Sequence, residues 1–165
     1  MKRLILISLS ALVLAACQTE KPVTQSRTPS FYVSLASGGA EVDAAMARDM
    51  ISAYRGNNRL HPLIIDPELQ AAAQAEADAM ARADKPSSAE AFKARLASTG
   101  YAQPAANLSA GYHTLAEAFS GWRESPPHNR VLLDARATRI GIATAYAPNS
   151  KYKVYWALAV AADKR

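Results

Sequence analysis

Lys151-Tyr-Lys-Val-Tyr-Trp-Ala-Leu-Ala-Val-Ala161 is the stretch that decides the fold, because its pattern suits a strand buried on both faces. Side chains alternate between the two faces of a strand. One face would carry Tyr152, Val154, Trp156, Leu158 and Val160, and the other would carry Tyr155, Ala157 and Ala159. A strand that is apolar on both faces predicts a central position in a sheet, with helices covering each side.

A second strand pattern lies just before this one. Residues Arg139 to Ala147 and Lys151 to Ala161 are together rich in Ile, Val, Thr, Tyr and Trp, and Pro148-Asn149-Ser150 separates the two stretches. Two strand patterns joined by such turn residues are typical of a β-hairpin. We therefore expect the chain to close with an antiparallel hairpin in a small sheet.

About four helices are expected before the hairpin. Asp66-Pro67-Glu68 is a favourable helix start, with Asp as N-cap and Pro in the first turn. Ser87 with Glu90, and Thr114 with Glu117, have capping-box spacing. The expected segments are about 41–55, 66–83, 87–99 and 114–124. Helices followed by a buried hairpin predict an α+β fold, with the sheet between helical layers.

The N-terminus has the three parts of a secretory signal. Lys2 and Arg3 precede an apolar run from Leu4 to Leu14, and small residues follow. The run is too short to span a bilayer, which needs about 20 apolar residues. Leu14-Ala15-Ala16-Cys17 resembles the lipobox of bacterial lipoproteins, which implies cleavage before Cys17 and acylation of that residue. The alternative is an ordinary secreted protein with a stray cysteine.

The predicted organisation is a signal peptide at 1–16, a lipidated cysteine and tether at 17–39, and one domain at 40–165. The tether is rich in Thr, Ser, Pro and Gln. Within it, Phe31 to Leu35 either packs on the domain as a short strand or belongs to the tether. Gln18, rather than Asp, follows the cysteine, and in bacterial lipoproteins this implies the outer membrane. We expect an anchored domain that faces the periplasm.

Composition excludes several classes of protein. Cleavage of residues 1–16 removes Lys2 and Arg3, so the formal charge of +5 falls by two to +3. This charge is small and scattered, whereas nucleic-acid binding calls for a clustered basic face. Cys17 is the only cysteine, so no disulfide forms within the domain. No glycine-rich phosphate loop is present.

Several motifs in order resemble the CAP superfamily of cysteine-rich secretory, antigen 5 and pathogenesis-related proteins, with its bacterial SCP-like branch. They cover roughly residues 41 to 162. The matching stretches are Ile51 to Arg55, His61 to Leu69, Gly100-Tyr101, Asn107 to Gly111, Trp122 to His128, Gly141 to Ala143 and Tyr155-Trp156. The resemblance implies an α-β-α sandwich.

The resemblance also implies a cleft with two histidines and one or two acidic residues, which bind a divalent metal in several members. Only the second histidine has a counterpart, His128. Asn107 of the Gly-Glu-Asn motif is retained. The other positions carry Ala106 for the glutamate, Ser87 or Ser88 for the first histidine, and Ser125 for the acid after the tryptophan. A zinc site generally needs three or four protein ligands. We therefore expect no metal and no cofactor.

Two residues have competing interpretations. His128 is either a general base or a histidine that fixes its loop through hydrogen bonds. Glu76 falls within the apolar stripe of the second helix, and a buried carboxylate needs a partner. It either pairs with an arginine such as Arg55 or Arg130, or it faces the cleft near His128.

The sequence favours a binding module over an enzyme. We expect a lipid-anchored envelope protein whose domain binds a partner, or a lipid, peptide or glycan ligand, in the periplasm. The expected ligand-binding residues are His128, Asn107, Ser125 and Glu76. The alternative is a metal-independent hydrolase of peptide or cell-wall material that uses His128 with Glu76 or Glu124. A purely structural spacer is a third possibility.

Overall fold

Strand β4 (Val154–Lys164) is an inner strand of a four-stranded sheet with the order β1-β3-β4-β2. The computed structural model describes residues 28–164. On its two sides β4 pairs antiparallel with β3 (Arg139–Tyr146) and with β2 (Tyr101–Ala110). The short β1 (Ile64–Ile65) runs parallel to β3. The predicted hairpin and the central position of its second strand are confirmed.

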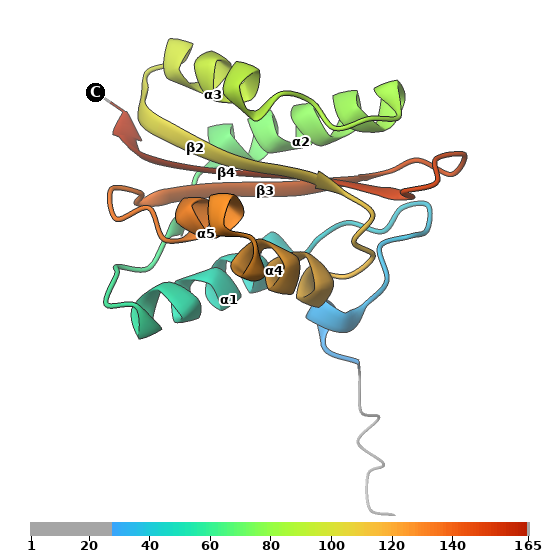
Figure 1. The fold of residues 1–165 in the computed structure, drawn as a ribbon, viewed down its shortest axis with the longest axis horizontal. Helices are drawn as coiled ribbons and strands as arrows, with labels where there is room; N and C mark the ends of the chain where they lie inside the picture. Colours follow the sequence, from blue (N-terminus) through green and yellow to red (C-terminus); the bar gives the residue numbers. More distant parts are fainter. Residues whose placement is uncertain (1–27, 165) are drawn as a thin grey trace, which may run out of the picture.

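Helices cover both faces of the sheet (Figure 1). One face carries α2 (Pro67–Ala83) and α3 (Ala89–Ser98), and the other carries α1 (Ala44–Asn57), α4 (Leu115–Glu124) and α5 (Pro126–Leu132). The predicted α+β sandwich is confirmed. The described residues form five α-helices rather than the expected four.

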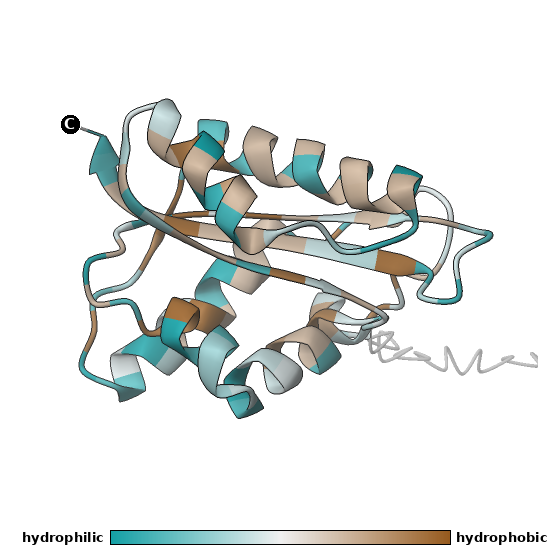
Figure 2. Ribbon diagram, turned by 45° about the horizontal axis from the view of Figure 1, so that its top comes forward, coloured by the Kyte–Doolittle hydropathy of each residue, from teal (hydrophilic) through white to brown (hydrophobic). Residues whose placement is uncertain are grey.

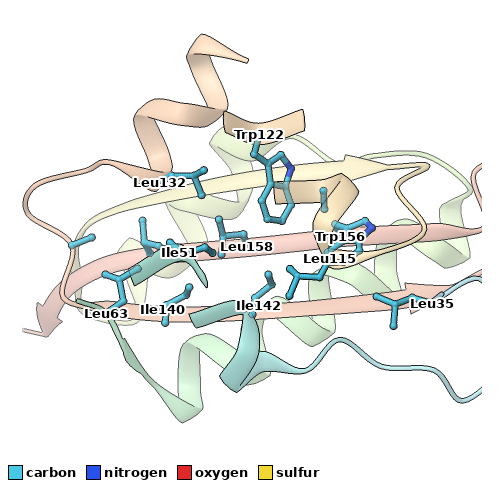
Figure 3. Packing of buried hydrophobic residues seen from close by; sticks show 14 of the residues in the cluster. Leu35, Ile51, Leu63, Leu115, Trp122, Leu132, Ile140, Ile142, Trp156 and Leu158 are labelled. Carbon is cyan, nitrogen blue, oxygen red and sulfur yellow. The ribbon is translucent and has the colours of Figure 1, made fainter. Parts of the chain in front are cut away.

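The two faces of β4 belong to different clusters, as alternation predicts. Figure 3 shows the larger cluster, in which Trp156 and Leu158 of β4 pack with residues of α1, α4 and α5. Trp122 and Trp156 are fully buried there and meet edge to face, with ring centroids 5.8 Å apart. On the opposite face, Tyr155 and Ala157 pack with the alanines of α2. Figure 2 shows how hydropathy is distributed over the fold. Hydrophilic residues lie on the helices and loops, and mostly apolar or neutral residues lie along the middle of the sheet.

Helix α2 packs unusually close to the sheet at Gly141. A Cβ atom at this position would lie 2.2 Å from the carbonyl carbon of Leu69. Only glycine permits this approach, and the small side chains Ala73 and Ala77, both fully buried, allow it to continue along the helix. The alanine-rich stripe thus explains the close packing of α2 on the sheet.

Three elements were not expected from the sequence. They are the strands β1 and β2 and the helix α5, which directly follows α4. Helix α3 is capped by Ser88, which accepts from Ala91 N, and not by Ser87. The capping box of Thr114 and Glu117 is confirmed.

The N-terminal part of the described chain packs on the domain without forming a strand. Residues Ser30–Tyr32 form a 3-10 turn, and Leu35, only 4% exposed, lies in the core. The packed part of the chain therefore begins before residue 40. The predicted signal peptide, Cys17 and residues 18–27 of the tether lie outside the described residues. Within residues 28–164, every helix is too short or too polar to cross a bilayer.

Candidate functional site

A cleft of about 580 Å³ lies at the β2 edge of the sheet. Its walls are the first turns of α3, residues 105–107 of β2, helix α5, and the loop after α5 as far as Arg136. The cleft is therefore open between α3 of one layer and α5 of the other, with the edge strand β2 at its base. Figure 1 shows these two helices on opposite sides of β2.

Asn107 and His128 are brought together in this cleft. Asn107 is fully buried, and its Nδ2 donates to the backbone oxygen of His128 at 3.0 Å. That bond holds the first turn of α5 against β2. Asn107 Oδ1 and His128 Nδ1 are both buried and have no hydrogen-bond partner within the described chain.

These two atoms are exceptional in the molecule. Among the described residues, the other buried side-chain atom without a hydrogen-bond partner is Arg48 Nε, and that atom lies 2.6 Å from a carboxylate oxygen of Asp49. Burial lowers the pKa of His128 below its ordinary value of 6.5. The imidazole is therefore neutral at pH 7, and Nδ1 can donate or accept according to its tautomer.

The cleft carries more positive than negative charge. Lys93 pairs with Glu90 at 2.6 Å, and Arg136 pairs with Asp134 at 2.7 Å. The hydrogen bond from Arg136 is the main reason that the pKa of Asp134 lies below its ordinary value. Arg130 also lines the cleft, and it has no ion pair among the described residues. The cleft therefore offers one uncompensated cation.

The residues present do not fit a divalent metal. Residues 28–164 contain no group of three or more His, Cys, Asp or Glu side chains that could hold an ion. Ala106 brings a methyl group to the cleft wall where the family motif has glutamate. Ser88 is occupied as the N-cap of α3. Within the described part of the chain, His128 is thus the only imidazole lining this cleft.

Glu76 lies on the opposite face of the sheet from His128. It is 4% exposed, pairs with Arg95 of α3, and lines a separate pocket of about 550 Å³ between α2 and α3. Of the two interpretations of Glu76, the structure has the arginine pair, but the partner is neither Arg55 nor Arg130. Arg55 is instead fully buried and donates to the backbone oxygens of His61, Leu132, Asp134 and Ala137.

The remaining predicted residues do not line the cleft. Ser125 is half-buried at the junction of α4 and α5, where its backbone oxygen accepts from Asn129 N at 2.8 Å. Glu124 is exposed at the end of α4. Neither glutamate proposed for a hydrolase therefore reaches His128. Lys93 and Arg130 were not predicted as cleft residues. Whether their side chains reach the cleft depends on how α3 and α5 pack on the two sides of β2, which no local sequence pattern shows.

A three-layer α-β-α sandwich with a cleft at one sheet edge is the class of domain that this chain forms. The model of the CAP family, described as the cysteine-rich secretory protein family, matches residues 48–160. The chain belongs to this family. Comparison with curated proteins gave no match.

Three solved bacterial structures are similar in fold. An outer surface protein from Borrelia burgdorferi is 16% identical with a TM-score of 0.63, and the match covers 73% of this chain and 92% of that one. An extracellular protein containing an SCP domain from Bacillus anthracis is 16% identical with a TM-score of 0.60, over 73% of this chain and 40% of that chain.

The third is a cysteine-rich secretory protein from Staphylococcus aureus. It is 17% identical with a TM-score of 0.61, over 73% of this chain and 38% of that one. This chain thus spans less than half of the two longer proteins.

Proposed function

We propose that this chain is a lipid-anchored protein of the bacterial cell envelope, and that its cleft binds a polar ligand through Asn107 and His128. The observation that carries the proposal is the pair of buried, unpartnered atoms, Asn107 Oδ1 and His128 Nδ1, in one cleft. A buried polar atom without a partner costs about 1–3 kcal/mol. A fold that keeps two such atoms in one cleft is suited to a ligand that completes their hydrogen bonds.

The cleft chemistry describes that ligand. Asn107 Oδ1 requires a donor, and neutral His128 can serve as donor or acceptor. Arg130 adds a cation at the rim. The ligand should therefore carry an N–H or O–H group close to an anionic group. The acids of the cleft, Glu90 and Asp134, are each held by a cation, which favours binding over general-base catalysis.

The anchor is inferred from the sequence. Acylation of Cys17, on its sulfur and its new amino group, would hold the chain on a membrane, since more than one acyl chain gives stable attachment. The next ten residues, 18–27, reach at most about 35 Å when extended. The domain would thus stay close to the outer membrane, facing the periplasm. Two of the similar structures, an outer surface protein and an extracellular protein, support a place in the envelope.

Native mass spectrometry of the full chain, isolated from an envelope fraction, tests ligand binding. We expect a co-purifying mass that is lost in Asn107→Ala and His128→Gln. Ser125→Ala is the matched control, because Ser125 was a predicted ligand residue but does not line the cleft. Circular dichroism checks that each variant folds. A bare mass for the unaltered chain, or a ligand retained by folded His128→Gln, would contradict the proposal.

The anchor has its own test. The intact mass of the mature chain should show cleavage before Cys17 and added acyl groups, and Cys17→Ser should move the protein from the membrane to the soluble fraction. An unmodified Cys17 in the envelope-isolated chain would refute lipid anchoring and leave the cleft proposal untouched.

A further inference from the structure

The two sides of the sheet differ in whether the outward backbone groups of their strands have hydrogen-bond partners. At the β3 edge, helix α2 and the segment before it satisfy the outward backbone groups. Asp66 N donates to Ile140 O at 2.9 Å, and Gln70 both donates to Ile142 O at 2.7 Å and accepts from Ile142 N at 3.0 Å. Gln74 continues this cover by donating to Thr144 O at 3.1 Å. Amide side chains thus take the place of a missing neighbouring strand.

The β2 edge has no such cover within the described chain. Gly111 N donates to Val154 O at 3.0 Å. This bond shows which residues of β2 direct their backbone N–H and C=O groups toward β4. The register from Ala105 to Ala110 has no shift, so every second residue before Gly111 also bonds to β4 through its backbone. These residues are Ser109, Asn107 and Ala105. The backbone N–H and C=O groups of Ala106, Leu108 and Ala110 therefore point away from the sheet. No hydrogen bond within residues 28–164 reaches them.

The open edge and the cleft coincide. Ala106, with its outward backbone groups, lines the cleft between α3 and α5, beside the unpartnered Asn107 Oδ1. Residues 105–110, Ala-Ala-Asn-Leu-Ser-Ala, contain no charged side chain. Natural edge strands usually carry charges, prolines or bulges that prevent another strand from pairing. Here the bulge and Pro104 lie before Ala105, and the edge beyond them is unprotected.

We propose that an acidic peptide in extended conformation adds to β2 as a further strand, pairing with the backbone of Ala106 and Leu108. This rests on the proposed function and names its ligand class. Peptides that add to a sheet edge bind through main-chain hydrogen bonds, and pockets for alternate side chains give specificity. The side chains on the α5 side of the peptide would lie beside His128 and Arg130, both of which can donate to a carboxylate. The uncompensated charge of Arg130 selects a carboxylate there.

Peptide binding to the full chain tests this directly. The probe is a fluorescein-labelled hexapeptide of alternating valine and glutamate, compared with the valine–lysine peptide of equal length. Fluorescence anisotropy should show binding of the acidic peptide and at least about tenfold weaker binding of the basic one. No binding of the acidic peptide at about 1 mM, which corresponds to only about 4 kcal/mol, would overturn the proposal.

Backbone methylation separates strand addition from recognition of side chains. Two further acidic peptides carry N-methyl groups, one on the odd-numbered residues and one on the even-numbered residues. The glutamate side chains turn one face of the peptide toward α5. In a strand the backbone amides of alternate residues point to opposite edges, so either the odd-numbered or the even-numbered residues direct their amides at β2, but not both. One methylated peptide should lose at least about tenfold in affinity and the other should keep it. Equal binding of the two would show that no strand is added.

The chain offers a matched pair of variants. Ala106→Pro removes an outward N–H without breaking the pairing with β4, and Ala110→Pro does the same outside the cleft. We expect the loss of peptide binding only in Ala106→Pro. If Ala106→Pro does not fold, the methylated peptides decide the question on the unaltered chain. A fully binding, folded Ala106→Pro would contradict the proposal.

Other occupants of this edge give different results. Residue-resolved hydrogen exchange should show fast exchange at Ala106 and Leu108 in the free chain and slow exchange with the peptide bound. Slow exchange without peptide would mean that the chain's own N-terminal segment, or a second copy, already covers the edge. Sedimentation separates these two, and either one refutes the peptide proposal. A non-peptide mass in the cleft would refute it as well, while the proposed function would stand.

Discussion

His128 gives the cleft a group whose charge depends on pH. Burial lowers its pKa from 6.5, so the unfolded chain binds this proton more readily than the folded chain. The contribution of His128 to the free energy of unfolding is therefore complete above about pH 6.5 and declines as the pH falls through its lowered pKa. Urea unfolding between pH 8 and pH 5 should show this loss, and His128→Gln should reduce it.

His113 provides the control for this prediction, because its side chain is exposed. The loss in His113→Gln is compared with the loss in His128→Gln. The acids with lowered pKa, such as Asp134, titrate below 3.8 and so do not contribute in this range. An identical slope in His128→Gln and the unaltered chain would show that burial of this imidazole has no effect on stability.

Gly141 sets the distance between α2 and the sheet. In Gly141→Ala the new methyl group would lie 2.2 Å from Leu69 C and 2.5 Å from Gln70 N, and neither backbone atom can move alone. We expect the free energy of unfolding to fall by about 1–3 kcal/mol. Gly56→Ala, in α1 with open space around it, should be neutral or stabilising by about 0.5–1 kcal/mol. Similar stabilities of the two variants would contradict this account.

At the scale of elements, α2 does more than cover a face, because Gln70 also closes the edge of β3. Gln70→Leu would keep the size of the side chain but leave the N–H and C=O of Ile142 without their partner. We expect a loss of about 1–3 kcal/mol in the free energy of unfolding. Gln74→Leu removes only one bond to the strand and should cost less. A larger effect of Gln74→Leu in chemical denaturation would argue against this role.

An element could be predicted from the sequence where residues close together in the chain determine it, and not where tertiary contacts do. The start of α2 was predicted because Asp66 and Pro67 act locally, and Asp66 accepts from Glu68 N and Leu69 N. β2 was missed because its residues are small and include Pro104, so its pairing with β4 comes from tertiary contacts. α5 was not predicted, although Pro126 and Pro127 stand in its first turn, where proline is favoured.

The same limit applies to the candidate site. Resemblance to the family located Asn107 and His128, which the structure brings together. Helical phase alone showed that Glu76 points inward, as its burial confirms. Its partner, Arg95, depends on how α3 lies across α2, and no local pattern encodes that arrangement. Sequence reasoning therefore identified individual buried groups but could not choose between their partners.

For the whole molecule, β4 couples the two helical layers because each of its faces lies in a different core cluster. Removing either layer would expose one apolar face of this strand, so neither layer should be stable without the other. A single domain of this size is expected to unfold in one transition.

The positions of the tryptophans allow a test of this coupling. Trp122 and Trp156 both lie in the cluster with α1, α4 and α5, so their fluorescence reports that layer alone. Gly141→Ala disturbs the opposite, α2 side. If the layers unfold together, this substitution lowers the Tm recorded by tryptophan fluorescence by the same amount as the Tm recorded by far-UV circular dichroism. A fluorescence transition that stays in place while the circular dichroism signal splits would show that the layers unfold separately. In that case β4 and the α1, α4 and α5 layer would form a stable unit without α2.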